Sequence, residues 1–190
     1  MAQAKACGYL LDNLTSKGPA MQIPCSRAQA MFADPGIRLA RHTPGFMLWD
    51  EHGGTFVLRV EELAATEVAV GEPETGIILE IPLSAREELI RSLEEFAAQQ
   101  QLALAPPSGP ELVVEVVLAA CHLPVQNLFV FAEEPLLLVK RRGEAVELAL
   151  TGAFKARRLP CQETDLVIHL TRAAMARLVA LVLSLARDGL

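Results

Sequence analysis

The chain has 190 residues, a formal net charge of −6 at pH 7 and 52% hydrophobic residues. That length accommodates one large domain or two small ones, and the composition provides ample apolar material for a core. The negative charge disfavours non-specific adhesion to DNA or to anionic lipid, although it leaves room for a local basic face.

Neither a targeting signal nor a membrane span is evident. The first 20 residues contain no apolar run of the length that a secretory signal needs, and no stretch reaches the roughly 18 uncharged apolar residues of a membrane helix. The cysteines are widely spaced without a CxxC pair, so we expect reduced, mostly buried thiols. These features predict a cytoplasmic protein without a membrane segment.

The N-terminal segment, residues 1–44, has a mixed pattern. Ser26 is placed to cap a short helix over residues 26–32, which an Asp-Pro-Gly sequence would end. From Gly45 onward the pattern is typical of strands. Residues 46–49 and 56–60 flank a turn with two glycines, which predicts a β-hairpin.

Further strands are expected at residues 67–70 and 77–83, and an amphipathic helix follows them. Ser84 is placed to cap this helix, with Glu87 at the capping-box spacing. Its apolar stripe is formed by Leu89, Ile90, Leu93, Phe96 and Ala97. Residues 104–110 hold three prolines and a glycine, which predicts a linker.

The second half of the chain shows the same kind of pattern. A turn is expected at residues 142–144, and Thr171 is placed to cap a final helix over residues 172–187. Strands are expected at residues 112–119, 127–131, 136–140, 145–150 and 166–170.

One block of this pattern occurs twice. Residues 56–70 align without a gap on residues 136–150, and residues 79–84 align on 166–171, where a strand leads into a helix in both copies. We therefore predict an α+β fold of two antiparallel β-sheet-plus-helix repeats, ββββα twice, related by a pseudo-symmetric duplication. The expected division is an N-terminal segment 1–44, repeat 1 at 45–103, a linker at 104–110 and repeat 2 at 111–190.

The final helix is apolar on all sides. Residues 178–186 contain no charge, and such a helix must be covered on more than one side. The cover can come from the rest of the chain or from a second subunit, and an exposed apolar face of that size marks an interaction site. The candidate interface residues are Leu178, Val179, Leu181, Val182 and Leu185.

The two copies carry opposite charge. Acids outnumber bases in residues 54–100, whereas bases outnumber acids from residue 127 onward. A basic turn and strand can hold phosphates, can pair with the acidic copy of the same or a neighbouring chain, or can protect a solvated strand edge from aggregation. The candidate polyanion-binding residues are Lys140, Arg141, Arg142, Lys155, Arg157 and Arg158.

Motifs for catalysis, cofactors and metals are missing from the sequence. It contains no GxSxG, Walker or GxGxxG motif, and no close Cys/His pairs of the kind that structural zinc sites use. We therefore predict no catalytic, cofactor-binding or metal-binding residue.

The strand-to-helix junction at residues 77–96, IILEIPLSAREELIRSLEEF, resembles the PUR repeat and, more distantly, the Whirly fold. In both, four antiparallel strands precede one helix, and the two-copy arrangement fits the PUR family. The resemblance implies single-stranded nucleic-acid binding on the sheet faces. Binders of this kind stack bases on aromatic side chains, and the strands of the second copy offer Phe129 and Phe131.

Taken with the charge asymmetry, these patterns predict a non-enzymatic binding or assembly protein that acts through protein contacts, as a homo-oligomer or with a protein partner. The alternative is a single-stranded nucleic-acid-binding protein of PUR- or Whirly-like fold. An enzyme with an unrecognised site is the least favoured hypothesis.

Overall fold

The computed structural model is built mostly of β-strands, with two helices in the described residues. It describes residues 21–32, 37–41, 45–52, 54–60, 64–68, 76–107, 113–123, 128–158 and 166–188. Residues 1–20 of the expected N-terminal segment and residues 108–110 of the expected linker lie outside these ranges, as do Cys7 and Cys161.

The described strands form one 12-stranded antiparallel sheet in the order β1-β4-β5-β12-β9-β10-β11-β7-β2-β3-β6, with β8 paired beside β10. In this order, the second-half strands β12, β9, β10 and β11 lie together between two groups of strands from the first half of the chain. The strands are β1 (Met21–Cys25), β2 (Arg27–Phe32), β3 (Ile37–Arg41), β4 (Gly45–His52), β5 (Thr55–Val60), β6 (Ala64–Val68), β7 (Gly76–Pro82), β8 (Val113–Glu115), β9 (Leu118–Leu123), β10 (Leu128–Arg142), β11 (Ala145–Arg158) and β12 (Leu166–Thr171).

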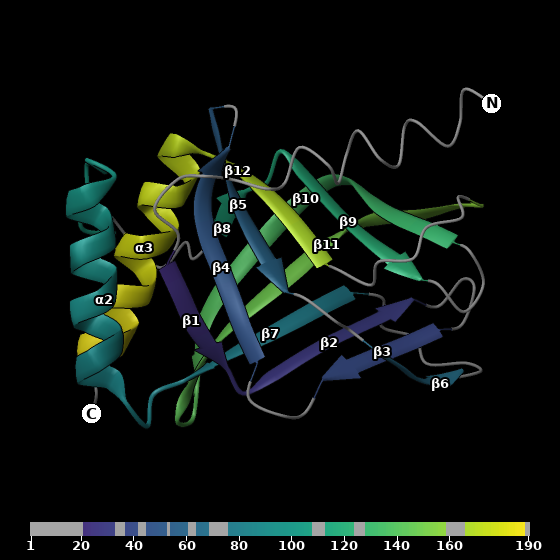
Figure 1. Ribbon diagram of the computed structural model, residues 1–190, viewed down its shortest axis with the longest axis horizontal. Coiled ribbons are helices and arrows are strands. Elements are labelled where there is room, and N and C mark those ends of the chain that lie inside the picture. Colours follow the sequence, from purple (N-terminus) through teal and green to yellow (C-terminus); the bar gives the residue numbers. More distant parts are fainter. Residues whose placement is uncertain are drawn as a thin grey trace.

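The sheet curls on itself into a half-barrel (Figure 1). Only Ser26 separates β1 from β2, yet β1 pairs with β4 near one end of the sheet and β2 pairs with β7 towards the other. The Ser26 backbone N–H donates to the Glu80 carbonyl oxygen at 2.9 Å, and its hydroxyl donates to the same oxygen at 3.2 Å. These bonds fix the bend at which one continuous segment joins the two arms of the curl.

The two helices, α2 (Arg86–Gln99) and α3 (Arg172–Arg187), lie side by side at one side of the curled sheet (Figure 1). Helix α3 packs against strands β5, β8, β10, β11 and β12 on one side and against α2 on the other. Helix α2 adds Phe96, whose ring meets Trp49 and Phe56 edge to face. Among the residues that the structure describes, no helix is long and apolar enough to span a membrane.

The expected α+β fold of two ββββα repeats is wrong. Strands β5 and β7 come from the first expected repeat, but β5 pairs with β12 and β7 pairs with β11, both from the second. The similarity between the β7–α2 and β12–α3 junctions is local and does not extend to separate sheets. Strands of the two halves pair with one another, and buried residues from both halves belong to one main core.

The short helix expected at residues 26–32 is also wrong, because residues 27–32 form strand β2. This strand is paired on both sides, with β7 and with β3, so ladder hydrogen bonds outweigh the local helix signal. The hairpin between β4 and β5, the turn after Arg142 and the helix at residues 172–187 are confirmed. Residues 127–131 and 136–140 belong to one long strand, β10, and residues 112–119 are divided between β8 and β9.

A bulge divides β10 and its partner β11 into two segments. The register shifts between Glu133 and Leu136, where Glu134 adopts a positive φ of 49°. Opposite the bulge, Gly152 has a φ of 150°, and a Cβ added there would lie 3.0 Å from the Glu133 carbonyl oxygen. Glycine is needed at this position both for its backbone conformation and for the close approach.

The two helix starts generate a first prediction. Thr171 accepts a hydrogen bond from the Ala174 N–H at 3.1 Å, whereas helix α2 begins after Ala85 without a side-chain cap. Thr171→Ala should therefore lower the free energy of unfolding by about 1 kcal/mol. Ser84→Ala, the matched control at the other expected cap, should change it little in urea denaturation. Equal losses in the two variants would contradict this assignment.

The bulge generates a second prediction. Gly152→Ala should lower the free energy of unfolding by roughly 2–4 kcal/mol, because it combines backbone strain with a steric contact. Gly143→Ala is the control: its φ is 59°, but its added Cβ would meet nothing within 4 Å, so its loss should be about 1 kcal/mol. Thermal and urea unfolding measure both, and a Gly143→Ala loss as large as that of Gly152→Ala would rule out the contact as the cause.

Candidate functional site

The six expected basic residues all lie on the β10–β11 hairpin, but they form two separate groups. Lys140, Arg141 and Arg142 lie beside the turn, and we call them the turn group. The far group, at the other end of β11, consists of Lys155, Arg157 and Arg158. Register pairs place Lys140 opposite Glu147 and Arg157 opposite Phe129, so the groups are separated by roughly 30 Å along the strands.

The turn group is engaged by the protein itself. Lys140 Nζ lies 2.9 Å from Glu147 Oε1, and Arg142 Nη1 lies 2.8 Å from Glu147 Oε2. Arg141 donates from Nε to the Gly143 carbonyl at 3.2 Å and from Nη1 to the Asp188 carbonyl at 3.1 Å. Lys140 and Arg142 therefore pair within the second copy, with Glu147, and not with the acidic first copy as one of the three expected roles had it.

Glu147 is the acid that organises this end of the hairpin. Its side chain is only 2% exposed, although those of Lys140 and Arg142 are more than half exposed. Burial acts to raise the pKa of Glu147, but hydrogen bonds from Arg142 and Lys140 outweigh it, so the pKa lies below its ordinary value. The same hydrogen bond raises the pKa of Arg142.

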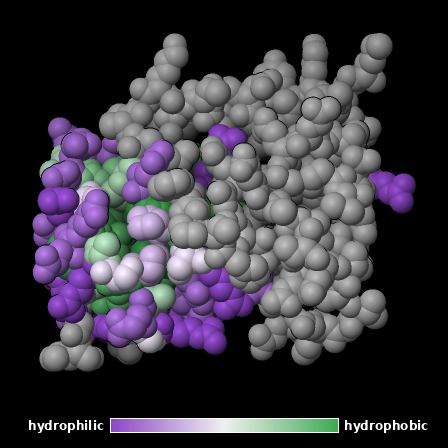
Figure 2. All heavy atoms as spheres, turned by 60° about the horizontal axis from the view of Figure 1, so that its bottom comes forward, coloured by the Kyte–Doolittle hydropathy of each residue, from purple (hydrophilic) through white to green (hydrophobic). Residues whose placement is uncertain are grey.

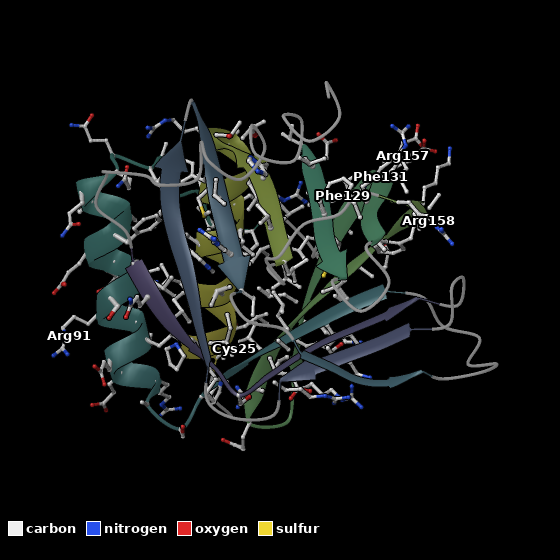
Figure 3. All side chains as sticks on the ribbon, turned by 45° about the vertical axis from the view of Figure 1, so that its right-hand side comes forward. Cys25, Arg91, Phe129, Phe131, Arg157 and Arg158 are labelled. Carbon is white, nitrogen blue, oxygen red and sulfur yellow. The ribbon has the colours of Figure 1, made fainter. Side chains whose placement is uncertain are left out.

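The far group lies beside the aromatic pair (Figure 3). The rings of Phe129 and Phe131 stack with centroids 6.1 Å apart and an angle of 25° between their planes. The guanidinium carbon of Arg157 lies 5.2 Å from the centroid of the Phe131 ring, which is a cation–π distance. Lys155 pairs with Glu133 at 2.6 Å, and both side chains are about half exposed.

This end of β11 is a strand edge within the described structure. Residues 145–150 of β11 pair with β7, but residues 151–158 are paired only with β10 among the described residues. Arg157 and Arg158 are exposed, and the two phenylalanines are partly exposed. Protection of a solvated strand edge is consistent with this placement, and so is contact with a ligand.

A second exposed feature lies on the same hairpin, between the two groups. Leu136 is 40% exposed and Leu138 is 38% exposed, although the intervening Leu137 is fully buried. The alternation shows that β10 turns one apolar face to the core and another to the outside. The sequence pattern indicated the strand but not that both of its faces carry leucine.

The candidate interface residues of helix α3 lie inside the molecule. Leu178, Val179, Leu181 and Val182 are at most 1% exposed and belong to the main core, and Leu185 is partly buried against it. Packing within the chain, one of the two expected covers, accounts for their burial. They offer no surface to a partner in this conformation.

Other chemistry has little support in the described residues. Cys25 and Cys121 are buried thiols, and no group of three or more His, Cys, Asp or Glu side chains in the described part is arranged to hold a metal ion. An open cavity of about 530 Å³ lies at the start of α2, lined among others by Glu87, Glu88 and Glu144.

Comparisons of the chain with protein-family models, with curated proteins and with solved structures find no match. The resemblance to PUR and Whirly proteins therefore stays a hypothesis. What can be said of function depends on the two features of the β10–β11 hairpin, the far group with its aromatic pair and the exposed leucines.

The Glu147 cluster generates a third prediction. Because the folded-state pKa lies below the unfolded value, the Glu147 carboxylate stabilises the fold above about pH 4.3, the ordinary value, and this contribution is lost as the pH falls through the folded-state pKa. Glu147→Gln should cost about 1–3 kcal/mol at pH 7. The difference from wild type should shrink in urea unfolding as the pH falls below about 4.

Glu133→Gln is the matched control, because Glu133 also pairs with a lysine but its side chain is 47% exposed. Its loss at pH 7 should stay below about 1 kcal/mol, as for other exposed ion pairs. A pH-independent difference between Glu147→Gln and wild type would contradict a role for the charge.

Proposed function

We propose that this is a non-enzymatic, cytoplasmic binding protein, and that the far end of the β10–β11 hairpin binds single-stranded nucleic acid. The observation that carries the proposal is the contact between Arg157 and Phe131, beside the stacked ring of Phe129. This contact places an aromatic surface and positive charge together at the end of the β10–β11 hairpin that lies far from the turn (Figure 3).

The aromatic and basic side chains match the bases and the phosphates of single-stranded nucleic acid, respectively. Unpaired bases stack on aromatic rings, at about 1–3 kcal/mol per base, and arginine adds cation–π contact. Arg157 and Arg158 are neighbours on β11, on opposite faces of the strand, and can contact phosphates, whereas Lys155 already pairs with Glu133. The overall negative charge of the chain confines such binding to this local site.

This function is favoured over protein contacts through α3, because the α3 residues are buried. It is also favoured over binding at the turn group, because Glu147 already neutralises Lys140 and Arg142. Protein contact through another surface remains compatible with nucleic-acid binding, and the exposed leucines of β10 are the place to look for it.

A direct test measures the anisotropy of a fluorescently labelled single-stranded oligothymidine at 50 mM salt. Phe131→Ala and Arg157→Ala should each weaken binding by about 5- to 100-fold, since each removes a stacking or cation–π contact. The logarithm of affinity should fall with the logarithm of salt concentration with a slope of about −1.4, from about 0.7 per phosphate and the two arginines.

Two controls separate this site from general electrostatics. Arg91→Ala removes an exposed charge on α2, on the opposite side of the molecule (Figure 3), and should leave affinity unchanged. Arg141→Ala removes a charge of the turn group and should also have little effect. If the wild type fails to bind at low salt, or if the two control variants weaken binding as much as Arg157→Ala, the proposal fails.

A further inference from the structure

The outward face of the far end of the hairpin continues past the aromatic pair to a carboxylate. Phe129, Phe131 and Glu133 alternate with the buried Val130 and Ala132, so these three side chains lie on one face of β10. Successive members of the row are about 6.6 Å apart, the length of two residues of a strand. A strand of nucleic acid that stacks a base on Phe131 can therefore bring the adjoining sugar close to Glu133.

The carboxylate of Glu133 is held by a lysine of the neighbouring strand. Lys155 Nζ lies 2.6 Å from Glu133 Oε1, and the side chain of Glu133 is still 47% exposed. Ala153, the register partner of Glu133 on β11, is exposed, and its small side chain leaves space beside the carboxylate. Because an ionised carboxylate accepts hydrogen bonds at both oxygens, Glu133 Oε2 retains the capacity to accept from a ligand.

The ion pair also changes how this acid acts near phosphates. An unpaired carboxylate would repel a phosphate backbone, but Lys155 compensates the charge of Glu133 at hydrogen-bond distance. What remains is an acceptor oxygen beside the stacking ring of Phe131. Such an oxygen favours a ligand that carries a hydrogen-bond donor next to a stacked base.

The far end of the hairpin lies away from the helices, at an edge of the molecule. In Figure 2 the hydrophobic area of the described part gathers on the left, the side of the helices, while hydrophilic side chains project from the right-hand edge. Figure 1 places the far end of β11 on that right-hand side. Lys155, Arg157 and Arg158 are exposed there, so an extended strand can reach the row from solvent.

A donor next to the base distinguishes RNA from DNA. Every ribose carries a 2′-hydroxyl that can donate a hydrogen bond, whereas the sugar–phosphate backbone of DNA offers no donor. We propose that the far end of the hairpin prefers single-stranded RNA to single-stranded DNA, with Glu133 accepting from the 2′-hydroxyl beside the base on Phe131. This inference rests on the proposed nucleic-acid binding and adds the class of nucleic acid that the site selects.

The test compares labelled oligouridine with oligodeoxyuridine of the same length and at the same salt concentration, so that only the sugar differs. The wild type should bind oligouridine about 5- to 20-fold more tightly, the gain from one hydrogen bond to a charged but half-exposed acceptor. An oligouridine with fluorine at each 2′ position keeps the sugar conformation of RNA but lacks the donor. It should bind like oligodeoxyuridine.

Glu133→Ala should bring the ratio of RNA to DNA affinity to about 1, because it removes the acceptor. It also frees Lys155, so binding of oligodeoxyuridine should not weaken, and its salt slope should steepen from about −1.4 to about −2.1. Glu94→Ala is the matched control: Glu94 pairs with Arg187 on the helix side, and its side chain is 52% exposed. This variant should leave the ratio unchanged.

The outcomes separate this inference from the nucleic-acid site itself. A wild type that binds oligodeoxyuridine through Phe131 and Arg157, but oligouridine no better, would overturn the RNA preference and leave the site standing. Failure to bind either oligonucleotide would overturn both. A preference that Glu133→Ala retains, or that the fluorinated strand shares, would exclude the bond to Glu133. Circular dichroism verifies folding, and Glu133→Val, which suits a strand, replaces Glu133→Ala where that variant does not fold.

Discussion

The bend at Ser26 is the constraint on which the fold depends. Its N–H and its hydroxyl donate to one acceptor, the Glu80 carbonyl, and the next residue, Arg27, reaches the Glu80 side chain at 3.3 Å. A single segment thereby belongs to both arms of the sheet. Because β1 and β2 cannot be far apart, the strands between them along the sheet order must curl, and their inner faces enclose a common core.

The composition of α3 follows from that curl. A half-barrel leaves an opening that a helix can fill, and α3 contacts strands from both arms while α2 covers its other side. Because α3 is covered on both sides, a polar stripe on it would place charge in the core. Accordingly, ten residues of α3 are buried and residues 178–183 carry no polar side chain. Helix α2 forms the outer layer, and only Leu89, Leu93, Phe96 and Ala97 are buried. The asymmetry between the two helices reflects inner and outer layers of one core.

Local features of this fold could be read from the sequence, and the pairing could not. The Thr171 cap, the turn after Arg142 and the alternation of β7 depend on residues close in the chain. The pairs β5–β12 and β7–β11 join residues far apart, and an apparent repeat suggested partners within each half. Ser26 shows the same limit: its capping signal is local, while the strand that replaces the helix is held by two distant neighbours. Glu147 lies in an apolar run, and its burial depends on Lys140 and Arg142 across the hairpin.

The hairpin also shows why a count of basic residues is a poor guide to a binding site. Its two ends carry the same number of cations, but at the turn Glu147 and backbone carbonyls engage all three. At the far end an acid pairs with Lys155, while Arg157 lies on an aromatic ring and Arg158 is exposed. The residue directly opposite does not decide this difference, because Lys155 lies opposite Phe131 yet pairs with Glu133, and Arg142 lies opposite Ala145 yet pairs with Glu147. What decides it is whether a carboxylate lies within reach on the same face of the hairpin. The bulge at Glu133 and Gly152 separates the two environments, so one hairpin can stabilise the fold at one end and remain open to a ligand at the other.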